Sequence, residues 1–266
     1  MLDIKNTQFL TKEDMRSKAN SIFTQHGSSS TSEKYIHIST DKVIDDMELL
    51  GWGVVDVKQI KSRKSDGFQK HLVVFRNNDI QITSEDGDTV WPQILLTNSH
   101  DGKNAFTFTA GLFRMVCENG LVVSTQQFEK MKIRHYGYSF EELQATIKAM
   151  VEKLPLTVEA LNKFREIELN QEQVLEFAKK AITTRFDEKE LEHIKIDFDA
   201  LLNPTRKEDE GQDLWSVYNV LQEKLIHGMF EYKVGVKSRK ARKIKNFQQD
   251  IVINEKLFNF ALEYAN

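Results

Sequence analysis

The chain has 266 residues, of which 40% are hydrophobic and 29% are charged, and its formal net charge at pH 7 is −3. These proportions are those of an ordinary soluble globular protein, with one large domain or a domain with a helical extension. The slight negative charge argues against a protein that coats nucleic acid with its whole surface, but it leaves room for a local basic site.

The sequence contains no targeting or membrane signal. The first residues, MLDIKNTQFLTKEDM, lack the apolar core of a signal peptide, and nowhere do 18 apolar residues follow one another. The single cysteine excludes an intramolecular disulfide and suits a reducing compartment. We therefore expect a cytoplasmic protein that does not span a membrane.

Three regions are predicted along the chain: an N-terminal arm over residues 1–33, an α+β core over 34–154 and a helical C-terminal region over 155–266. The arm is expected to carry a short helix around residues 12–23, followed by a flexible loop, GSSSTS. In the core, Thr40 is expected to cap a helix whose apolar residues recur at helical spacing and which ends at Gly51.

Alternating and β-branched residues predict a mainly antiparallel sheet after this helix. Its expected strands cover residues 52–60, 68–76, 80–82 and 91–96, with a polar turn at 62–67. Further along, Phe106 and Phe108 alternate with Thr107 and Thr109. This strand is therefore expected to bury one face and to expose the other to water.

Polar side chains are unusually dense between residues 95 and 135, where they stand among short apolar runs. The members of this predicted structural or functional cluster are Asn98, His100, Asp101, Arg114, Asn119 and His135. A plain structural sheet would place such residues only at its turns, so their density predicts a polar surface or a buried network.

Helices are predicted after residue 135, with two of them over residues 139–154 and 158–168. The expected end signals are Ser139 with Glu142, Asn170 with Gln173, Asp213 and Asn254 as caps, and Gly228 as a stop. The fold class is therefore α+β, a mainly antiparallel sheet with an N-terminal helix, followed by a helical C-terminal region.

Signatures of catalysis and metal binding are weak. His71, His100, Asp101 and His135 are of the types that bind divalent metals, but no pair has the spacing of a specific motif. A turn explains His100 and Asp101 better, and Cys117 lies in an apolar run typical of an inert core cysteine. We therefore predict no catalytic residue, metal or cofactor and favour a non-enzymatic role, with a metal-assisted hydrolase as a third hypothesis.

A basic run over residues 233–245, KVGVKSRKARKIK, contains no acidic residue. The expected nucleic-acid contacts are Lys237, Arg239, Lys240, Arg242 and Lys243, with Arg63, Lys64 and Arg134 as further candidates. Such a density of positive charge neutralises backbone phosphates without reading bases, and nearby aromatic side chains would stack the bases of a single strand. A solvated loop or a contact with a partner protein is the other interpretation.

Three blocks of the sequence carry a family resemblance. The stretch containing NSHDG, AFTFTAGLFRMVCENGLVV and IRH resembles the core signature of an uncharacterised family of phage- and plasmid-encoded proteins, one of the domain-of-unknown-function families. YIHISTDKVIDDMELLGWGVVDVKQIKS resembles the N-terminal block of that family, and LWSVYNVLQEKLIHG with RKARKIKNFQQDIVINEKLFNFALEYA resembles its C-terminal end. The resemblance implies residence on a mobile genetic element and no settled biochemistry.

Residues 35–76 are also similar to the opening of single-strand annealing recombinases, which form oligomeric rings that hold DNA along a basic groove. The first hypothesis is therefore a DNA-binding protein of a mobile element that handles single strands in replication or recombination, with a homo-oligomer as a further expectation. In it, Arg134 and His135 order the central sheet or line the groove. The alternative is an interaction protein that blocks a host factor, such as a defence nuclease, through the acidic stretch over residues 187–210.

Overall fold

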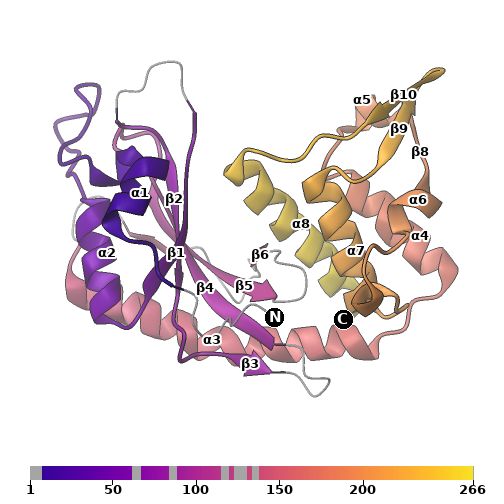
Figure 1. Ribbon diagram of the computed structural model, residues 1–266, viewed down its shortest axis with the longest axis horizontal. Coiled ribbons are helices and arrows are strands. Elements are labelled where there is room, and N and C mark those ends of the chain that lie inside the picture. Colours follow the sequence, from indigo (N-terminus) through magenta and orange to yellow (C-terminus); the bar gives the residue numbers. More distant parts are fainter. Residues whose placement is uncertain are drawn as a thin grey trace. The chain divides into compact units, whose positions relative to one another are not determined.

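The computed structural model describes residues 8–61, 67–83, 89–114, 120–122, 131–133 and 138–265 (Figure 1). Its contacts divide the chain into two compact units. The first unit comprises Met1–Arg114 and Gln126–Leu154, and the second comprises Met115–Thr125 and Pro155–Asn266. Each unit contains its own set of buried apolar side chains.

Short helices open the first unit: α1 (Lys12–Lys18), the 3-10 helix η2 (Asn20–Phe23) and α2 (Thr40–Leu49). α2 is capped by Ser39, whose hydroxyl accepts a hydrogen bond from the amide of Lys42 at 3.3 Å. The prediction that Thr40 caps this helix is wrong. Thr40 is fully buried, and its hydroxyl is engaged instead by side chains of the sheet.

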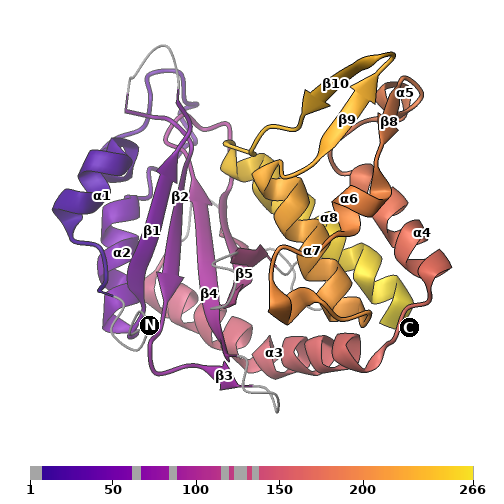
Figure 2. The ribbon, with the colours of Figure 1, turned by 45° about the vertical axis from the view of Figure 1, so that its right-hand side comes forward.

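An antiparallel sheet forms the middle of the first unit. Its strands are β1 (Gly53–Gln59), β2 (His71–Arg76), β3 (Ile82–Thr83), β4 (Thr89–Asn98), β5 (Phe106–Arg114) and β7 (Met131–Ile133). β1, β2, β4 and β5 are neighbours in that order, while β3 pairs with β4 and β7 pairs with β5. α1 and α2 lie beside β1 (Figures 1 and 2), and Val43, Ile44 and Met47 of α2 are buried.

Both faces of β5 are buried in the part whose side chains are described. The phenylalanine face is fully buried, as expected, but Thr107 and Thr109 on the other face are only 9% and 4% exposed. The prediction of a water-exposed threonine face is therefore wrong. The register places Thr109 beside Leu95 of β4, and Leu95 beside Val74 of β2, so buried apolar neighbours share this face. Alternation identifies the two faces of a strand, whereas the coverage of each face depends on the rest of the fold.

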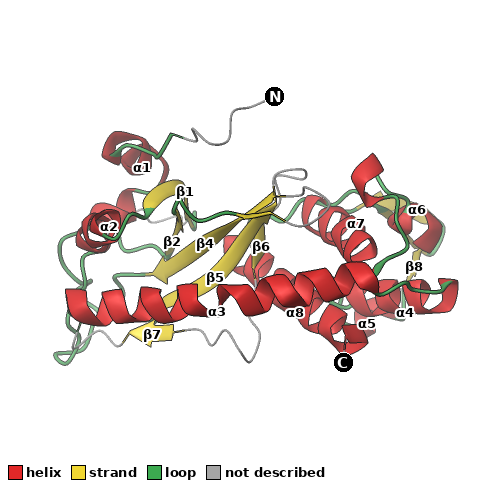
Figure 3. Cartoon of the chain, turned by 90° about the horizontal axis from the view of Figure 1, so that it is seen from below, coloured by secondary structure: helices red, strands yellow, loops and turns green. Residues whose placement is uncertain are grey.

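A helix of 27 residues, α3 (Phe140–Glu166), continues through the boundary between the two units at residues 154 and 155 (Figure 3). The predicted interruption between two helices is therefore wrong. An interior proline such as Pro155 costs a helix about 3 kcal/mol because it lacks an amide hydrogen. Buried apolar side chains lie on both sides of it, including Met150 before and Leu161 after, and their packing outweighs the local cost.

Longer helices build the second unit: α4 (Gln171–Ile182), α7 (Leu214–His227) and α8 (Phe247–Ala265). α7 contacts both α4 and α8, and its residues from Leu214 to Ile226 are buried, as expected for a central helix. The end signals that hydrogen bonds or backbone angles confirm are those at Ser139, Asn170, Asp213 and Gly228.

Asn254 does not begin the last helix, so its prediction as a cap is wrong. α8 starts at Phe247, and Asn254 lies within it, fully buried. Its side chain donates to the backbone carbonyl of Asp250 at 3.0 Å and accepts from Gln222 of α7 at 2.5 Å. A short polar side chain is accommodated inside a helix when such partners satisfy it.

Short elements complete the second unit: β6 (Gly120–Val122), α5 (Glu188–Leu191), β8 (Ile194–Ile196), α6 (Phe198–Leu202), the 3-10 helix η3 (Lys207–Asp209), β9 (Glu231–Val234) and β10 (Lys237–Lys240). β8, β9 and β10 form an antiparallel sheet in the order β10-β9-β8. The predicted α+β class is confirmed, although the prediction of a helical C-terminal region omits these strands. Among the described residues, no helix combines the length and apolar character needed to cross a membrane.

Candidate nucleic-acid interface

The basic run predicted to contact phosphates forms the hairpin of β9 and β10. Tyr232 lies opposite Arg239, Val234 lies opposite Lys237, and the turn between the strands carries Val236, which is 98% exposed. The exposed cations of the run are Lys233, Lys237, Arg239, Lys240, Arg242, Lys243 and Lys245. The hairpin therefore presents its positive charge to solvent.

The end of α7 positions the segment that follows this hairpin. α7 stops at Gly228, which adopts a left-handed φ of 68°. A Cβ atom on Gly228 would lie 2.5 Å from the backbone carbonyl carbon of Arg242. The amide of Ala241 donates to the carbonyl of Phe230 at 2.9 Å. The absence of a side chain at residue 228 therefore allows the backbone of Arg242 to lie against the end of the helix.

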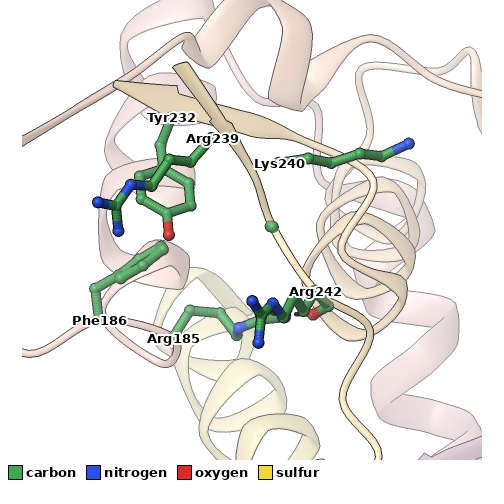
Figure 4. Close-up of a pocket in the computed structure, with 7 residues that line it drawn as sticks. Arg185, Phe186, Tyr232, Arg239, Lys240 and Arg242 are labelled. Carbon is green, nitrogen blue, oxygen red and sulfur yellow. Dashed lines mark hydrogen bonds between the residues drawn. The ribbon is translucent and has the colours of Figure 1, made fainter. Parts of the chain in front are cut away.

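A cavity of about 640 Å³ lies beside the hairpin in the second unit (Figure 4). The residues that line it are Arg185, Phe186, Tyr232, Arg239, Lys240, Ala241 and Arg242. Four of these side chains are cationic, two are aromatic and none is acidic. The volume is in the range of sites that hold small molecules, and the charge favours an anion.

Arg185 is held in place by the backbone around the cavity. Its guanidinium donates through Nη1 to the carbonyl of Leu225 in the last turn of α7 and through Nη2 to the carbonyl of Arg242, the latter at 2.9 Å. It also lies over the ring of Phe230, at 5.9 Å from the ring centroid. Burial lowers the pKa of Arg185, but an arginine remains charged at neutral pH. The cavity therefore contains a positive charge whose position is fixed before any ligand binds.

Two aromatic rings form another part of the wall. Phe186 and Tyr232 meet edge to face, with ring centroids 5.0 Å apart. Figure 4 shows Tyr232 and Arg239 at one side of the cavity, and Arg185 and Arg242 at another. The cavity thus combines a flat aromatic surface with a pair of arginines.

Only part of the predicted interface lines this cavity. Arg239, Lys240 and Arg242 do, whereas Lys237 and Lys243 are exposed elsewhere on the same segment. Arg63, Lys64 and Arg134 lie outside the described residues. The sequence prediction did not include Arg185, Phe186 and Tyr232. The local signals for them are an arginine followed by an aromatic residue shortly after the end of α4, and a tyrosine directly before the basic run.

The predicted polar cluster contains a buried network in the first unit. Nδ1 of His71 lies 3.1 Å from the carbonyl of Gln69 and 2.9 Å from the hydroxyl of Ser21, and its Nε2 lies 2.9 Å from the hydroxyl of Thr40. Asn98 donates to the same Thr40 hydroxyl at 3.0 Å. Burial lowers the pKa of His71 to about 4, although the bond to the Gln69 carbonyl opposes this. The network therefore joins η2, α2, β2 and β4 around a neutral imidazole.

His100 and Asp101 form the predicted turn. Asp101 accepts hydrogen bonds from the hydroxyl of Ser99 at 2.6 Å and from the amide of Lys103 at 3.1 Å, and Gly102 has a φ of 73°. The ring of His100 is buried. Within the described ranges, no three metal-binding side chains are arranged to hold an ion. The side chain of Arg114, and all of Asn119, Cys117 and His135, lie outside what is described.

The acidic stretch over residues 187–210 uses several of its carboxylates to support the fold. Asp187 caps α5 and Asp197 caps α6, each through a hydrogen bond to a backbone amide. Asp209 is only 2% exposed. Nearby, Arg206 forms an ion pair of 2.6 Å with Glu223 of α7. These carboxylates are therefore tied to local structure.

Comparisons with known proteins identify relatives over nearly the whole chain. The model of a family described as "Domain of unknown function (DUF932)" matches residues 28–258. The chain is 30% identical over 264 residues to UPF0380 protein YafZ and 29% identical over 270 residues to UPF0380 protein YfjQ, both of Escherichia coli (strain K12). Each match covers 97% of this chain and 92% of the relative.

No solved structure matches the chain. The family match includes every residue that lines the cavity, as well as Thr40, His71 and Asn98 of the buried network. It also confirms the predicted resemblance to an uncharacterised family. The chain therefore belongs to the DUF932 family, whose function is unknown.

Proposed function

We propose that this protein binds nucleic acid through its second unit, that it prefers single strands, and that it serves a mobile genetic element in replication or recombination. The observation that supports this proposal is the cavity, where four cations and two aromatic rings converge without a carboxylate. We also propose that the protein forms a homo-oligomer, as expected from the sequence.

The cations supply attraction to the nucleic-acid backbone. The seven exposed lysines and arginines of residues 233–245 lie on one continuous segment of the chain. Three of them, Arg239, Lys240 and Arg242, also line the cavity. Lysine and arginine neutralise phosphates irrespective of base sequence, and the counterions released make the affinity fall with salt. We therefore expect binding that depends strongly on salt and weakly on sequence.

The aromatic rings favour single strands over a duplex. Phe186 and Tyr232 line a cavity, where an unstacked base can reach them but a base inside a duplex stack cannot. Stacking of a base on an aromatic side chain contributes about 1–3 kcal/mol and tolerates any base.

One observation favours a second candidate function, a protein-interaction module that blocks a host factor. The seven exposed cations of residues 233–245 are complementary in charge to an acidic surface on a partner protein. This function predicts binding to a host protein and none to oligonucleotides.

Fluorescence-anisotropy titration of labelled single- and double-stranded oligonucleotides at two salt concentrations tests the proposal. The hairpin variant replaces Lys237, Arg239, Lys240, Arg242 and Lys243 with Gln. Binding by the unchanged protein is expected to prefer the single strand, to weaken with salt and to be lost in this variant.

A matched control variant replaces the same number of exposed lysines on other elements. They are Lys18, Lys42, Lys148, Lys163 and Lys179. It is expected to bind like the unchanged protein. Equal weakening in both variants would attribute the binding to net charge, and absence of binding at low salt would leave a protein partner as the leading explanation.

A further inference from the structure

The cavity beside the hairpin has two chemically different parts. Tyr232 and Phe186 offer two aromatic rings inclined at 63° to each other, and Figure 4 shows Arg239 next to Tyr232. Arg185 and Arg242 lie at another side of the same cavity. A nucleotide has the same division, with a flat base at one end and a phosphate at the other.

The pair of arginines suits a phosphate monoester better than the phosphodiester of a chain interior. A diester carries one negative charge, whereas a terminal phosphate carries about −1.5 to −2 at pH 7. The fork of guanidinium donors matches phosphate oxygens in geometry. Arg185 is already fixed by the carbonyls of Leu225 and Arg242, so little further ordering of this side chain is needed when an anion binds.

The size of the cavity limits what enters it. Its volume of about 640 Å³ is in the range that holds one drug-sized ligand, which is the size of a single nucleotide. Lys237 lies two residues before Arg239 in β10 and therefore projects from the same face of the sheet. A strand that leaves the cavity has this exposed lysine as its next cationic neighbour on the hairpin.

We infer that the cavity binds one nucleoside monophosphate unit, with its base stacked on Tyr232 and bordered by Phe186, and its terminal phosphate on Arg185 and Arg242. This inference rests on the proposed function, because the nucleotide is taken to be the phosphorylated end of a single strand. A free mononucleotide has the same chemistry, and the experiment separates the two sources.

Anisotropy titration compares one single-stranded sequence with a 5′-phosphate, a 3′-phosphate or no terminal phosphate. One phosphorylated end is expected to bind roughly tenfold more tightly than the unphosphorylated end, the value of one charge-assisted hydrogen-bond pair. Arg242→Gln is expected to abolish this difference. Lys243→Gln, a neighbouring exposed cation outside the cavity lining, is expected to weaken all three ligands while preserving the difference.

Competition identifies the role of the base. Deoxyadenosine 5′-monophosphate is expected to displace the oligonucleotide at lower concentration than inorganic phosphate or deoxyadenosine does, and Tyr232→Leu is expected to remove its advantage over inorganic phosphate. Equal competition by inorganic phosphate and the nucleotide would overturn the assignment of a base site.

The two proposals fail in different ways. If oligonucleotides bind equally with and without a terminal phosphate, and Arg242→Gln weakens both alike, the nucleotide site is wrong while nucleic-acid binding stands. If the mononucleotide binds in an Arg242-dependent manner but no oligonucleotide does, the site stands as a receptor for a free nucleotide and the proposed function is wrong.

Discussion

At the scale of single residues, Arg185 combines a structural role with a place in the lining of the cavity. Arg185 donates to two backbone carbonyls, one of which, on Leu225, belongs to the last turn of α7. The last carbonyls of a helix have no partner within the helix, so this bond stabilises the helix end. Arg185 also lines the cavity. The fold therefore fixes the position of a charge that the proposed ligand would meet.

Arg185→Lys separates charge from geometry at this position. The lysine keeps the positive charge but lacks the fork that reaches both carbonyls. We expect the free energy of unfolding to fall by about 1–3 kcal/mol, the contribution of hydrogen bonds from a charged donor, and the preference for a phosphorylated end to be lost. Urea denaturation measures the first effect and anisotropy the second. Unchanged stability would show that the hydrogen bonds from Arg185 to the two carbonyls contribute little. The control is Lys179→Gln, a substitution of an exposed residue on the preceding helix.

His71 makes stability depend on pH in a defined direction. Because burial lowers its folded pKa to about 4 from 6.5, the unfolded chain binds a proton more readily than the folded chain between these values. The contribution is complete above pH 6.5 and is lost as the pH falls towards 4. A difference of about 2.5 pH units at about 1.4 kcal/mol each gives a loss of about 3.5 kcal/mol.

Urea denaturation at several pH values between 7.5 and 4 tests this expectation. His71→Gln is expected to be less stable at pH 7.5 but to lose less further stability on acidification than the unchanged protein. Replacement of the exposed His193 with Gln should leave the original pH dependence. A His71→Gln variant with the same pH dependence as the unchanged protein would assign the effect to other groups.

At the scale of elements, the end of α7 and the β9–β10 hairpin depend on one glycine. Gly228 adopts a left-handed conformation and faces the backbone of Arg242. A Cβ atom at residue 228 would lie 2.5 Å from the carbonyl carbon of Arg242. The hairpin itself turns at Gly235, which also has a positive φ, of 61°, but has no atom within 4 Å of an added Cβ. These two glycines share a backbone requirement and differ in their surroundings.

Gly228→Ala and Gly235→Ala therefore form a matched pair. Gly235→Ala is expected to cost about 1–2 kcal/mol of unfolding free energy, the cost of a left-handed backbone for a residue with a Cβ, and to preserve nucleic-acid binding. Gly228→Ala is expected to cost more and to weaken binding, because the segment carrying Arg242 must move. Equal losses from both substitutions in thermal or urea denaturation would contradict a packing role for Gly228.

At the scale of the whole molecule, charge distribution matters more than net charge. The chain has a formal charge of −3, yet every charged side chain of residues 233–245 is positive. Replacing five lysines or arginines lowers the net charge to −8 in both the hairpin variant and the matched control variant. A difference between them therefore reports the location of the charge.

The salt dependence of binding gives this comparison a magnitude. For single strands, the slope of log K against log salt changes by about 0.7 for each phosphate contact. We expect the hairpin variant to have a slope smaller by up to about 3.5 units if all five cations touch phosphates, and the control variant to keep the original slope. Titrations over a series of salt concentrations measure both slopes, and identical slopes would exclude the hairpin as the contact surface.

Several local features of this protein could be predicted, and several could not, for identifiable physical reasons. The caps at Asn170 and Asp213 and the stop at Gly228 depend on the backbone within a few residues, and all three are confirmed. Thr40 and Asn254 have the same local chemistry, but partners on distant segments engage their side chains in the interior. Local preference is thus overridden where a tertiary hydrogen bond is available.

The amino-acid sequence by itself determined the α+β class, most helix ends, the basic run and the membership of an uncharacterised family, because these depend on neighbouring residues or on similarity along the chain. Only the tertiary structure decided that both faces of β5 are buried over residues 106–110 and that Arg185 and Phe186 join Tyr232, Arg239 and Arg242 around one cavity. Burial and cavities arise from contacts between segments far apart in the chain, and local sequence patterns carry no record of those contacts.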